Sequence, residues 1–260
     1  MSRAVAIVTG AARGIGAATA LEFARRGYDL AVTDILSKEL ADVAKEINDC
    51  GARTVVRNGD LADLRFAEQF IADAAQELGR IDVLVNNAGW RELLTMREIT
   101  VDSWDRTMRI CLTAPAFLSR WAAAVMERQR AGVIINVSSI MSRQSWGMAP
   151  AYVAAKGGLD ALTHDLAALY GPAGVRVVTV SPGAVDTEMG TSSSDVREWS
   201  EQMISLGRWA APAEIARAIA FLASDDASYI TATTLVIDGG WSRQFYPYGL
   251  KRKLRPEQFP

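Results

Sequence analysis

Short hydrophobic runs rich in β-branched residues alternate along the chain with longer stretches in which apolar residues recur every three or four positions. The short runs are typical of buried strands, and the longer stretches are typical of amphipathic helices. This alternation predicts an α/β fold with one doubly wound parallel sheet and helices on both faces. The seven predicted strands are Val5–Thr9, Leu30–Thr33, Thr54–Arg57, Val83–Val85, Gly132–Val137, Val175–Val180 and Leu235–Ile237. The predicted helices are Ile15–Arg26, Lys38–Asp49, Leu64–Leu78, Val101–Arg128, Ala151–Tyr170 and Ala213–Ala223.

No internal repeat, low-complexity tract or linker rich in Gly, Pro or Ser divides the sequence. A chain of 260 residues, half of them hydrophobic, can bury a large core as one domain. We predict a single domain over residues 1–240 and a tail over residues 241–260. The segment Trp241–Tyr248 carries four aromatic residues, so we expect the tail to reach a subunit interface or the rim of the active site.

The charge balance narrows the choice of partners. A net charge of −2 gives no general attraction to nucleic acid or to an anionic membrane. No apolar run approaches the ~18 residues of a membrane span, and Met1 leads into a strand without a signal-peptide pattern. The two cysteines form neither a disulfide framework nor a metal-site spacing. These features predict a soluble, cytoplasmic protein without a metal site.

A phenol and an ammonium group lie four residues apart in the predicted helix Ala151–Tyr170. Tyr152 and Lys156 would therefore occupy one face of the helix, one turn apart. The Lys156 charge would favour the phenolate form of Tyr152, which suits acid–base catalysis near neutral pH. Ser139 could hydrogen-bond the same substrate oxygen and stabilise charge that develops on it. A tyrosine and a lysine four residues apart are common on helix surfaces, so the surrounding motifs must show whether this pair is catalytic.

A glycine-rich turn follows the first predicted strand. Gly10, Gly14 and Gly16 lie between this strand and the first predicted helix. Glycines let the backbone turn sharply and approach a pyrophosphate, whose charge is met by free N–H groups at the start of the helix. The spacing G-x-x-x-G-x-G differs from the commoner G-x-G-x-x-G, but strand, glycines and helix occur in the required order. The turn predicts a dinucleotide site.

The choice between NAD and NADP depends on two residues. Asp34 follows the second predicted strand, where its carboxylate could accept hydrogen bonds from the adenosine ribose hydroxyls. A carboxylate there would repel a 2′-phosphate, which favours NAD. Arg13, a basic residue inside the glycine turn, weighs against this choice. We predict NAD as the preferred cofactor, with NADP as the alternative.

Taken together, the motifs resemble those of the classical short-chain dehydrogenase/reductase family over about residues 5–240. The matching segments are Thr9–Gly16, Asp60–Leu61, Asn86–Gly89, Ser139, Tyr152 with Lys156, Ser181–Gly183 with Thr187, and Asp238–Gly240. Their order and spacing are highly specific in combination. The resemblance implies a Rossmann fold, an oxidoreductase that acts on CH–OH donors with NAD or NADP, and a homotetramer.

The resemblance also implies a role for individual residues. Tyr152 would exchange the proton of the alcohol, Lys156 would bind the nicotinamide ribose, and Ser139 would hold the substrate oxygen. Thr187 would hydrogen-bond the nicotinamide carboxamide. The expected cofactor-binding residues are Gly10, Arg13, Gly14, Ile15, Gly16, Asp34, Asp60, Leu61, Asn87, Ala88, Gly89, Tyr152, Lys156, Pro182, Gly183, Val185 and Thr187.

Cys111 departs from the family pattern. It aligns with an asparagine that, in relatives, positions a water between the active-site lysine and solvent. A thiol is a weak donor and a weak acceptor. We therefore expect Cys111 to be a small buried residue, with the proton relay running through Thr113, a backbone carbonyl or water.

The substrate-binding residues are expected in loops beyond the carboxyl ends of the strands, where ligands of such sheets lie. Arg91, Arg143 and Gln144 would suit a hydroxylated or carboxylated small molecule. Trp90 or Trp146 could stack on a sugar ring or form an apolar wall. These residues favour an alcohol or ketone substrate of the sugar, polyol or hydroxy-acid class.

Further lining of the substrate pocket is expected from residues 188–209.

Two other functions share the same motifs. A 3-oxoacyl-(acyl-carrier-protein) reductase would prefer NADPH. A non-catalytic dinucleotide sensor or scaffold would account for Cys111, although Ser139, Tyr152 and Lys156 together favour an enzyme.

Overall fold

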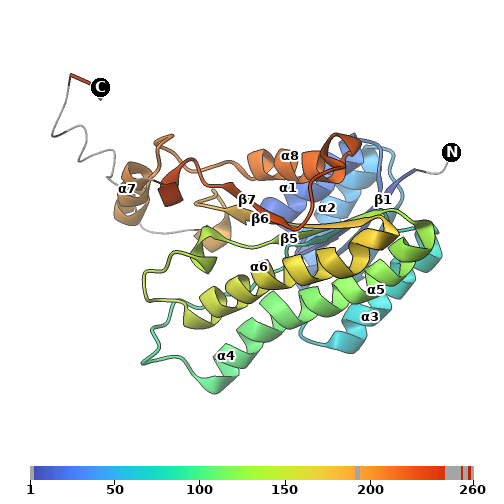
Figure 1. The fold of residues 1–260 in the computed structure, drawn as a ribbon, viewed down its shortest axis with the longest axis horizontal. Helices are drawn as coiled ribbons and strands as arrows, with labels where there is room; N and C mark the ends of the chain where they lie inside the picture. Colours follow the sequence, from blue (N-terminus) through green and yellow to red (C-terminus); the bar gives the residue numbers. More distant parts are fainter. Residues whose placement is uncertain (1–2, 191–193, 244–252, 254–256, 259–260) are drawn as a thin grey trace.

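The computed structural model describes residues 3–190, 194–243, 253 and 257–258 of the chain. In these residues, seven strands form one sheet in the order β3-β2-β1-β4-β5-β6-β7, and each neighbouring pair is parallel (Figure 1). The strands are β1 Val5–Thr9, β2 Asp29–Asp34, β3 Thr54–Asn58, β4 Val83–Asn86, β5 Gly132–Val137, β6 Val175–Pro182 and β7 Thr233–Ile237. The predicted doubly wound α/β fold is confirmed.

Helices cover both faces of this sheet. In Figure 1, α1, α2 and α8 lie on one face, and α3, α4, α5 and α6 lie on the other. The helices are α1 Gly14–Arg25, α2 Ser37–Asp49, α3 Leu64–Leu78, α4 Val101–Met108, α5 Ala114–Gln129, α6 Pro150–Tyr170, α7 Ser194–Met203 and α8 Pro212–Ala223. α7 was not predicted, although it lies within the segment expected to line the substrate pocket.

Each central strand is hydrophobic on both sides because both of its faces are covered. In β1, Val8 packs in the layer that holds Phe23 and Ile219, whereas Ile7 packs in the layer that holds Phe70 and Leu118. All six residues are at most 1% exposed. The unbroken apolar runs of the sequence are thus explained by two cores, one on each side of the sheet.

The prediction of one continuous helix over Val101–Arg128 is wrong at its centre. A π-helical segment, Arg109–Thr113, separates α4 from α5. Pro115 lies four residues after Cys111, and a proline has no N–H to donate to the Cys111 carbonyl. A wider π turn accommodates the proline ring without ending the helix. The segment places Cys111 in the protein interior.

Within the described part of the chain, no helix combines the length and apolar character needed to cross a lipid bilayer. Of the predicted tail, only residues 241–243, 253 and 257–258 are described. Trp241–Arg243 forms a short 3₁₀ turn. The remainder of the tail prediction lies outside the described residues.

Candidate active site

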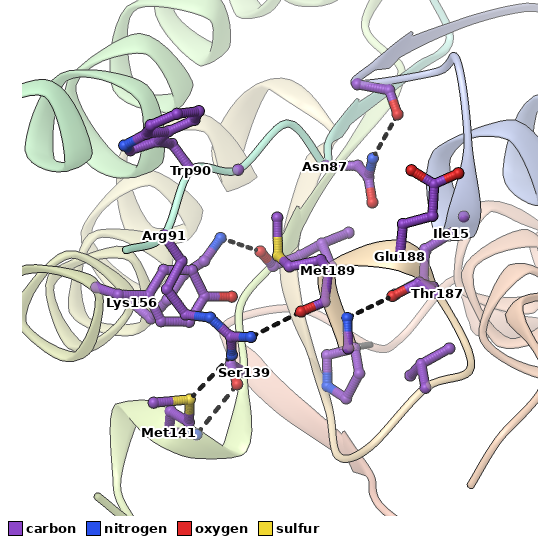
Figure 2. A pocket seen from close by; sticks show the side chains of 18 of the residues that line it. Ile15, Asn87, Trp90, Arg91, Ser139, Met141, Lys156, Thr187, Glu188 and Met189 are labelled. Atoms are coloured by element: carbon purple, nitrogen blue, oxygen red, sulfur yellow. Dashed lines mark hydrogen bonds between the residues drawn. The ribbon is translucent and has the colours of Figure 1, made fainter. Parts of the chain in front are cut away.

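A cavity of about 550 Å³ lies beyond the carboxyl ends of the strands, where the sheet order switches between β1 and β4. Residues from both halves of the sheet line it, and Figure 2 shows part of this lining. The sequence candidates that line it are Gly10, Arg13, Gly14, Ile15, Asp34, Asp60, Leu61, Asn87, Ala88, Gly89, Trp90, Arg91, Ser139, Gln144, Trp146, Tyr152, Lys156, Pro182, Gly183, Val185 and Thr187. Gly16 and Arg143 are not among the lining residues.

The glycine turn is held in place by Asn87, which follows β4. The Asn87 side-chain amide donates to the carbonyls of Thr9 and Gly10, at 2.9 and 3.0 Å. Gly10 has φ +64°, and a Cβ atom there would lie 2.8 Å from the Ala88 Cα. Only glycine combines this conformation with such a close approach. Although Gly16 does not line the cavity, it packs directly beneath the turn, against Gly10.

Asp34 lies beside this turn and Arg13 lies within it, and the two side chains have different partners. The Asp34 carboxylate accepts hydrogen bonds from the amides of Ala12 and Leu36, at 3.0 and 3.1 Å. Each carboxylate oxygen retains capacity to accept a further hydrogen bond from a ligand in the cavity. Arg13 forms an ion pair with Glu188, which follows β6. The only strongly basic side chain of the turn is therefore already paired with an acid.

Tyr152 and Lys156 lie one turn apart on α6, as their spacing predicted. Both are largely buried, with 8% and 3% of their surfaces exposed. The Lys156 Nζ donates to the Val137 carbonyl at 2.7 Å and lies 5.4 Å from the centre of the Tyr152 ring. Ser139, just beyond β5, lines the same cavity, and its Oγ accepts a hydrogen bond from the Met141 amide. The three groups thus line the same cavity.

A buried network of hydrogen-bonded side chains connects α6 to the strands of the sheet. The Asn86 amide donates to the Asn136 side chain at 2.9 Å, and the Asn136 amide donates to the Thr163 hydroxyl at 2.9 Å. The hydroxyls of Thr163 and Thr179 are 2.7 Å apart. These groups join β4, β5, α6 and β6, and each mutual bond offsets the cost of burying polar atoms. Unlike Asn87, Asn86 faces this network.

Cys111 contacts the backbone of Trp90, the residue after Gly89. Its thiol donates to the Trp90 carbonyl, and its sulfur accepts from the Trp90 amide, both at 3.3 Å. The thiol is completely buried. Cys111 is therefore the small buried residue that was expected, and in addition it fixes the start of a loop that lines the cavity.

Replacing Cys111 with alanine is expected to lower the free energy of unfolding by about 1–2 kcal/mol, because two weak hydrogen bonds are lost and a small void forms. Urea denaturation of the purified variant measures this change. Cys50→Ala is the control, since Cys50 is exposed and should give no change. Equal stability of Cys111→Ala and the unaltered protein would contradict a structural role for the thiol.

The other polar substrate candidates differ in their positions. Arg143 is 59% exposed in its side chain, and its Nε lies 3.8 Å from Asp160, outside the cavity lining. Gln144 lines the cavity and donates to the Ser242 carbonyl at 3.0 Å. Arg143 is thus not placed where its sequence position suggested, because a carboxylate on α6 attracts it.

Part of the apolar wall is formed by α7, inside the segment 188–209, and by the start of the tail. Trp199 on α7 and Trp241 both line the cavity and contact each other edge to face, with ring centres 6.4 Å apart. Asp238 accepts the amides of Gly240 and Ser242, which fixes the turn that carries Trp241. Burial opposes the charge of Asp238, but these hydrogen bonds outweigh it and hold its pKa below the ordinary value. Trp241 belongs to the tail, which was expected to reach a subunit interface or the rim of the active site.

Among the described residues, no group of three or more His, Cys, Asp or Glu side chains is placed to bind a metal ion.

Comparisons with known proteins agree with this geometry. A family model described as enoyl-(acyl carrier protein) reductase matches residues 10–242. The chain is 40% identical over 240 residues to cis-4-hydroxycyclohexanecarboxylate dehydrogenase of Sinomonas cyclohexanicum, covering 92% of this chain and 96% of that one. It is 36% identical over 239 residues to L-rhamnose 1-dehydrogenase (NAD(P)(+)) of Sphingomonas sp. (strain SKA58), covering 90% and 94%.

A solved structure of a short-chain type dehydrogenase/reductase from Mycobacterium marinum superposes with a TM-score of 0.89 at 30% identity, covering 94% of this chain and 97% of that one. The fold, the cavity and these matches, which each extend over most of the chain, lead to the same assignment. The protein belongs to the short-chain dehydrogenase/reductase family and is an NAD(P)-dependent oxidoreductase that acts on CH–OH groups.

Proposed function

We propose that the protein interconverts a secondary alcohol and a ketone, with NAD as its preferred cofactor and with a sugar, polyol or hydroxy acid as substrate. The observation that carries this proposal is the joint presence of Ser139, Tyr152 and Lys156 in the cavity that the glycine turn also lines. A proton-exchanging group and a dinucleotide site are thus adjacent, which is what hydride transfer coupled to proton transfer requires.

The cavity suits a dinucleotide on structural grounds. The turn has no side chain where Gly10 approaches Ala88, and it leads directly into the N-terminus of α1, whose N–H groups favour a pyrophosphate. Asp34 offers acceptors to ribose hydroxyls, and Thr187 lines the wall opposite, near Gly14. When bound, the nicotinamide supplies the hydride acceptor or donor.

The chain's own residues would then handle the proton. In oxidation, Tyr152 removes the proton from the substrate hydroxyl, and in reduction it returns the proton to the oxygen. Ser139 hydrogen-bonds the same oxygen and stabilises the charge that develops there. Lys156, whose Nζ is fixed by the Val137 carbonyl and lies 5.4 Å from the centre of the Tyr152 ring, would bind the nicotinamide ribose beside the reacting groups.

The preference for NAD rests on the charges around the turn. The Asp34 carboxylate lies where a 2′-phosphate would bring a second negative charge. Arg13, the residue that could have neutralised that phosphate, is paired with Glu188. Both observations favour the cofactor that has a free ribose hydroxyl.

NADH or NADPH formation should be measured with a panel of sugars, polyols, hydroxy acids and secondary alcohols, with NAD and NADP in parallel. We expect turnover with NAD, and we expect Asp34→Ser to lower kcat/KM for NAD and raise it for NADP, each by about 10-fold, because a charge-assisted contact is lost and a repulsion is removed. Asp42→Ser, an equal change of charge on the exposed face of α2, should leave both values unchanged.

Activity with NADP alone on 3-oxoacyl thioesters would replace this proposal with the acyl-reductase alternative. An enzyme that binds NAD tightly but turns over no member of either panel would replace it with the sensor alternative. The relatives support the first reading, since their names give a cyclic hydroxy acid and a sugar as substrates of those proteins.

We also propose that the protein is a cytoplasmic homotetramer in which β7 packs on its counterpart. β7 is an edge strand of the sheet, and Leu235 on it and Phe221 on α8 are both partly exposed. Exposed edges with apolar side chains are usually covered in the assembled protein. Both cysteines are free thiols, as is usual in a reducing compartment.

A further inference from the structure

Arg91 is a cation in the cavity without an acidic partner. Its Nη2 donates to the Met189 carbonyl at 2.8 Å, and its Nη1 lies 3.7 Å from the Met141 sulfur, so both contacts are with neutral groups (Figure 2). Every aspartate and glutamate of the chain falls within the described residues, and none of them forms an ion pair with Arg91. A guanidinium has five N–H donors, so several remain available to a ligand.

The other cations of the cavity are already engaged. Arg13 pairs with Glu188, and Arg106 pairs with Asp60 at 3.0 Å. Lys156 is bound to a backbone carbonyl beside Tyr152. Arg91 therefore differs from the other described basic groups of the lining, because no aspartate or glutamate neutralises its charge and it is not held against Tyr152 by a strand carbonyl.

Arg91 also lies next to the reacting groups. Its guanidinium carbon is 5.8 Å from the centre of the Tyr152 ring. Met141, which Arg91 contacts, donates its amide to the Ser139 hydroxyl. A substrate whose hydroxyl reaches Tyr152 and Ser139 would thus pass close to the guanidinium.

The rest of the lining offers few charges and much apolar surface. Tryptophan and methionine side chains form a large part of it, and such walls pack on rings and aliphatic chains rather than on polar surfaces. The residues concerned are Trp90, Met141, Trp146, Met189, Trp199, Trp209 and Trp241. One unpaired cation in apolar surroundings suits a ligand with one anionic group and an apolar body.

We propose that Arg91 binds a carboxylate of the substrate, and that the substrate class is a hydroxycarboxylic acid whose secondary alcohol is carried on an apolar ring or chain. This inference rests on the proposed dehydrogenase function and narrows its substrate. In oxidation, the carbinol hydride passes to NAD, the hydroxyl proton passes to Tyr152, and the product is an oxocarboxylate whose carboxylate is unchanged. The fork of Arg91 suits a planar carboxylate, which it can bind through two parallel hydrogen bonds.

The proposal is tested with cis-4-hydroxycyclohexanecarboxylate and its neutral carboxamide, which share size and ring and differ in charge. We expect a higher kcat/KM for the acid. Arg91→Met should lower kcat/KM for the acid by about 10- to 100-fold, mainly through KM, and change it for the amide by less than about 3-fold. Arg91→Lys should recover part of the loss because it keeps the charge but not the fork.

The neutral carboxamide also distinguishes a loss of carboxylate binding from a structural disturbance of the loop. Loss of the contact with Met189 would disturb the loop and affect acid and amide alike, so only the difference between them counts. Arg65→Met, at a surface arginine whose side chain is 96% exposed, should change neither. Equal kcat/KM for acid and amide, with no selective effect of Arg91→Met, would overturn the inference while leaving the dehydrogenase function intact.

Binding of cyclohexanecarboxylate, which has no alcohol to oxidise, gives a readout that does not depend on turnover. Calorimetry should show about 10-fold weaker binding to Arg91→Met than to the unaltered protein. If the carboxylate binds in an Arg91-dependent manner but no alcohol is turned over, the proposed function fails and the anion site stands. If the carboxylate binds both proteins equally, the anion site fails.

Discussion

Tyr152→Phe is expected to lose about 10²- to 10⁴-fold in kcat, the range that a positioned acid–base group contributes. The phenylalanine ring fills the same largely buried space but has no hydroxyl to exchange a proton with the substrate. Binding of NAD should be nearly unchanged, because the glycine turn and Asp34 are not altered. The rate is measured from the absorbance of NADH, and cofactor binding from the change in protein fluorescence on titration.

Tyr170→Phe is the matched control on the same helix. Tyr170 is as buried as Tyr152, and burial raises the pKa of its hydroxyl, but it does not line the cavity. The same chemical change there should leave kcat unaltered. If Tyr152→Phe kept its rate, another group would have to transfer the proton, and the assignment of Tyr152 would be wrong.

Gly16→Ala is expected to weaken dinucleotide binding, because the added methyl group would displace the glycine turn. A Cβ atom at this position would lie 1.9 Å from the Gly10 carbonyl oxygen and 2.6 Å from the Asn87 amide nitrogen. The closest atom belongs to the backbone, so the turn must move away from the start of α1. We expect kcat/KM for NAD to fall by about 100-fold, as a displacement of about 1 Å in a positioned site does, and stability to fall by about 1–3 kcal/mol.

Gly171→Ala provides the comparison, because an added Cβ there meets no atom within 4 Å and the backbone does not have a positive φ. It should change neither cofactor affinity nor stability appreciably. Unchanged NAD affinity in Gly16→Ala would mean that the nucleotide does not lie against this turn.

The strands and the glycine turn that lines the cavity could be predicted because their signals are local. Buried strands of a doubly wound sheet need continuous hydrophobic runs, and the glycine turn needs particular residues at a fixed distance from the first of them. The end of β4 brings Asn87 to the turn by the topology of the sheet alone.

The part of the cavity around Arg91 could not be predicted to the same degree. Arg91 and Arg143 are equivalent as sequence candidates, and only the fold shows that Asp160 attracts Arg143 while Arg91 remains without an acidic partner. The pairing of Arg13 with Glu188 joins residues 175 positions apart, so no local pattern reveals it. Pro115 was a local indication of the π-helical segment, because a proline interrupts the hydrogen bonds of an α-helix. The apolar periodicity on either side of the segment nevertheless predicts one continuous helix.

During synthesis of the chain, the glycine turn is made before Asn87, the residue whose side chain supports it. β1, β2 and β3 leave the ribosome before β4, so a nascent chain of this length presents one side of the fully buried β1 without a partner. The turn after β1 lacks its side-chain support until Asn87 arrives. On the proposed function, an NAD(P) cofactor would bind this turn, so its site would be complete only after β4 has been added and has covered the open edge of β1.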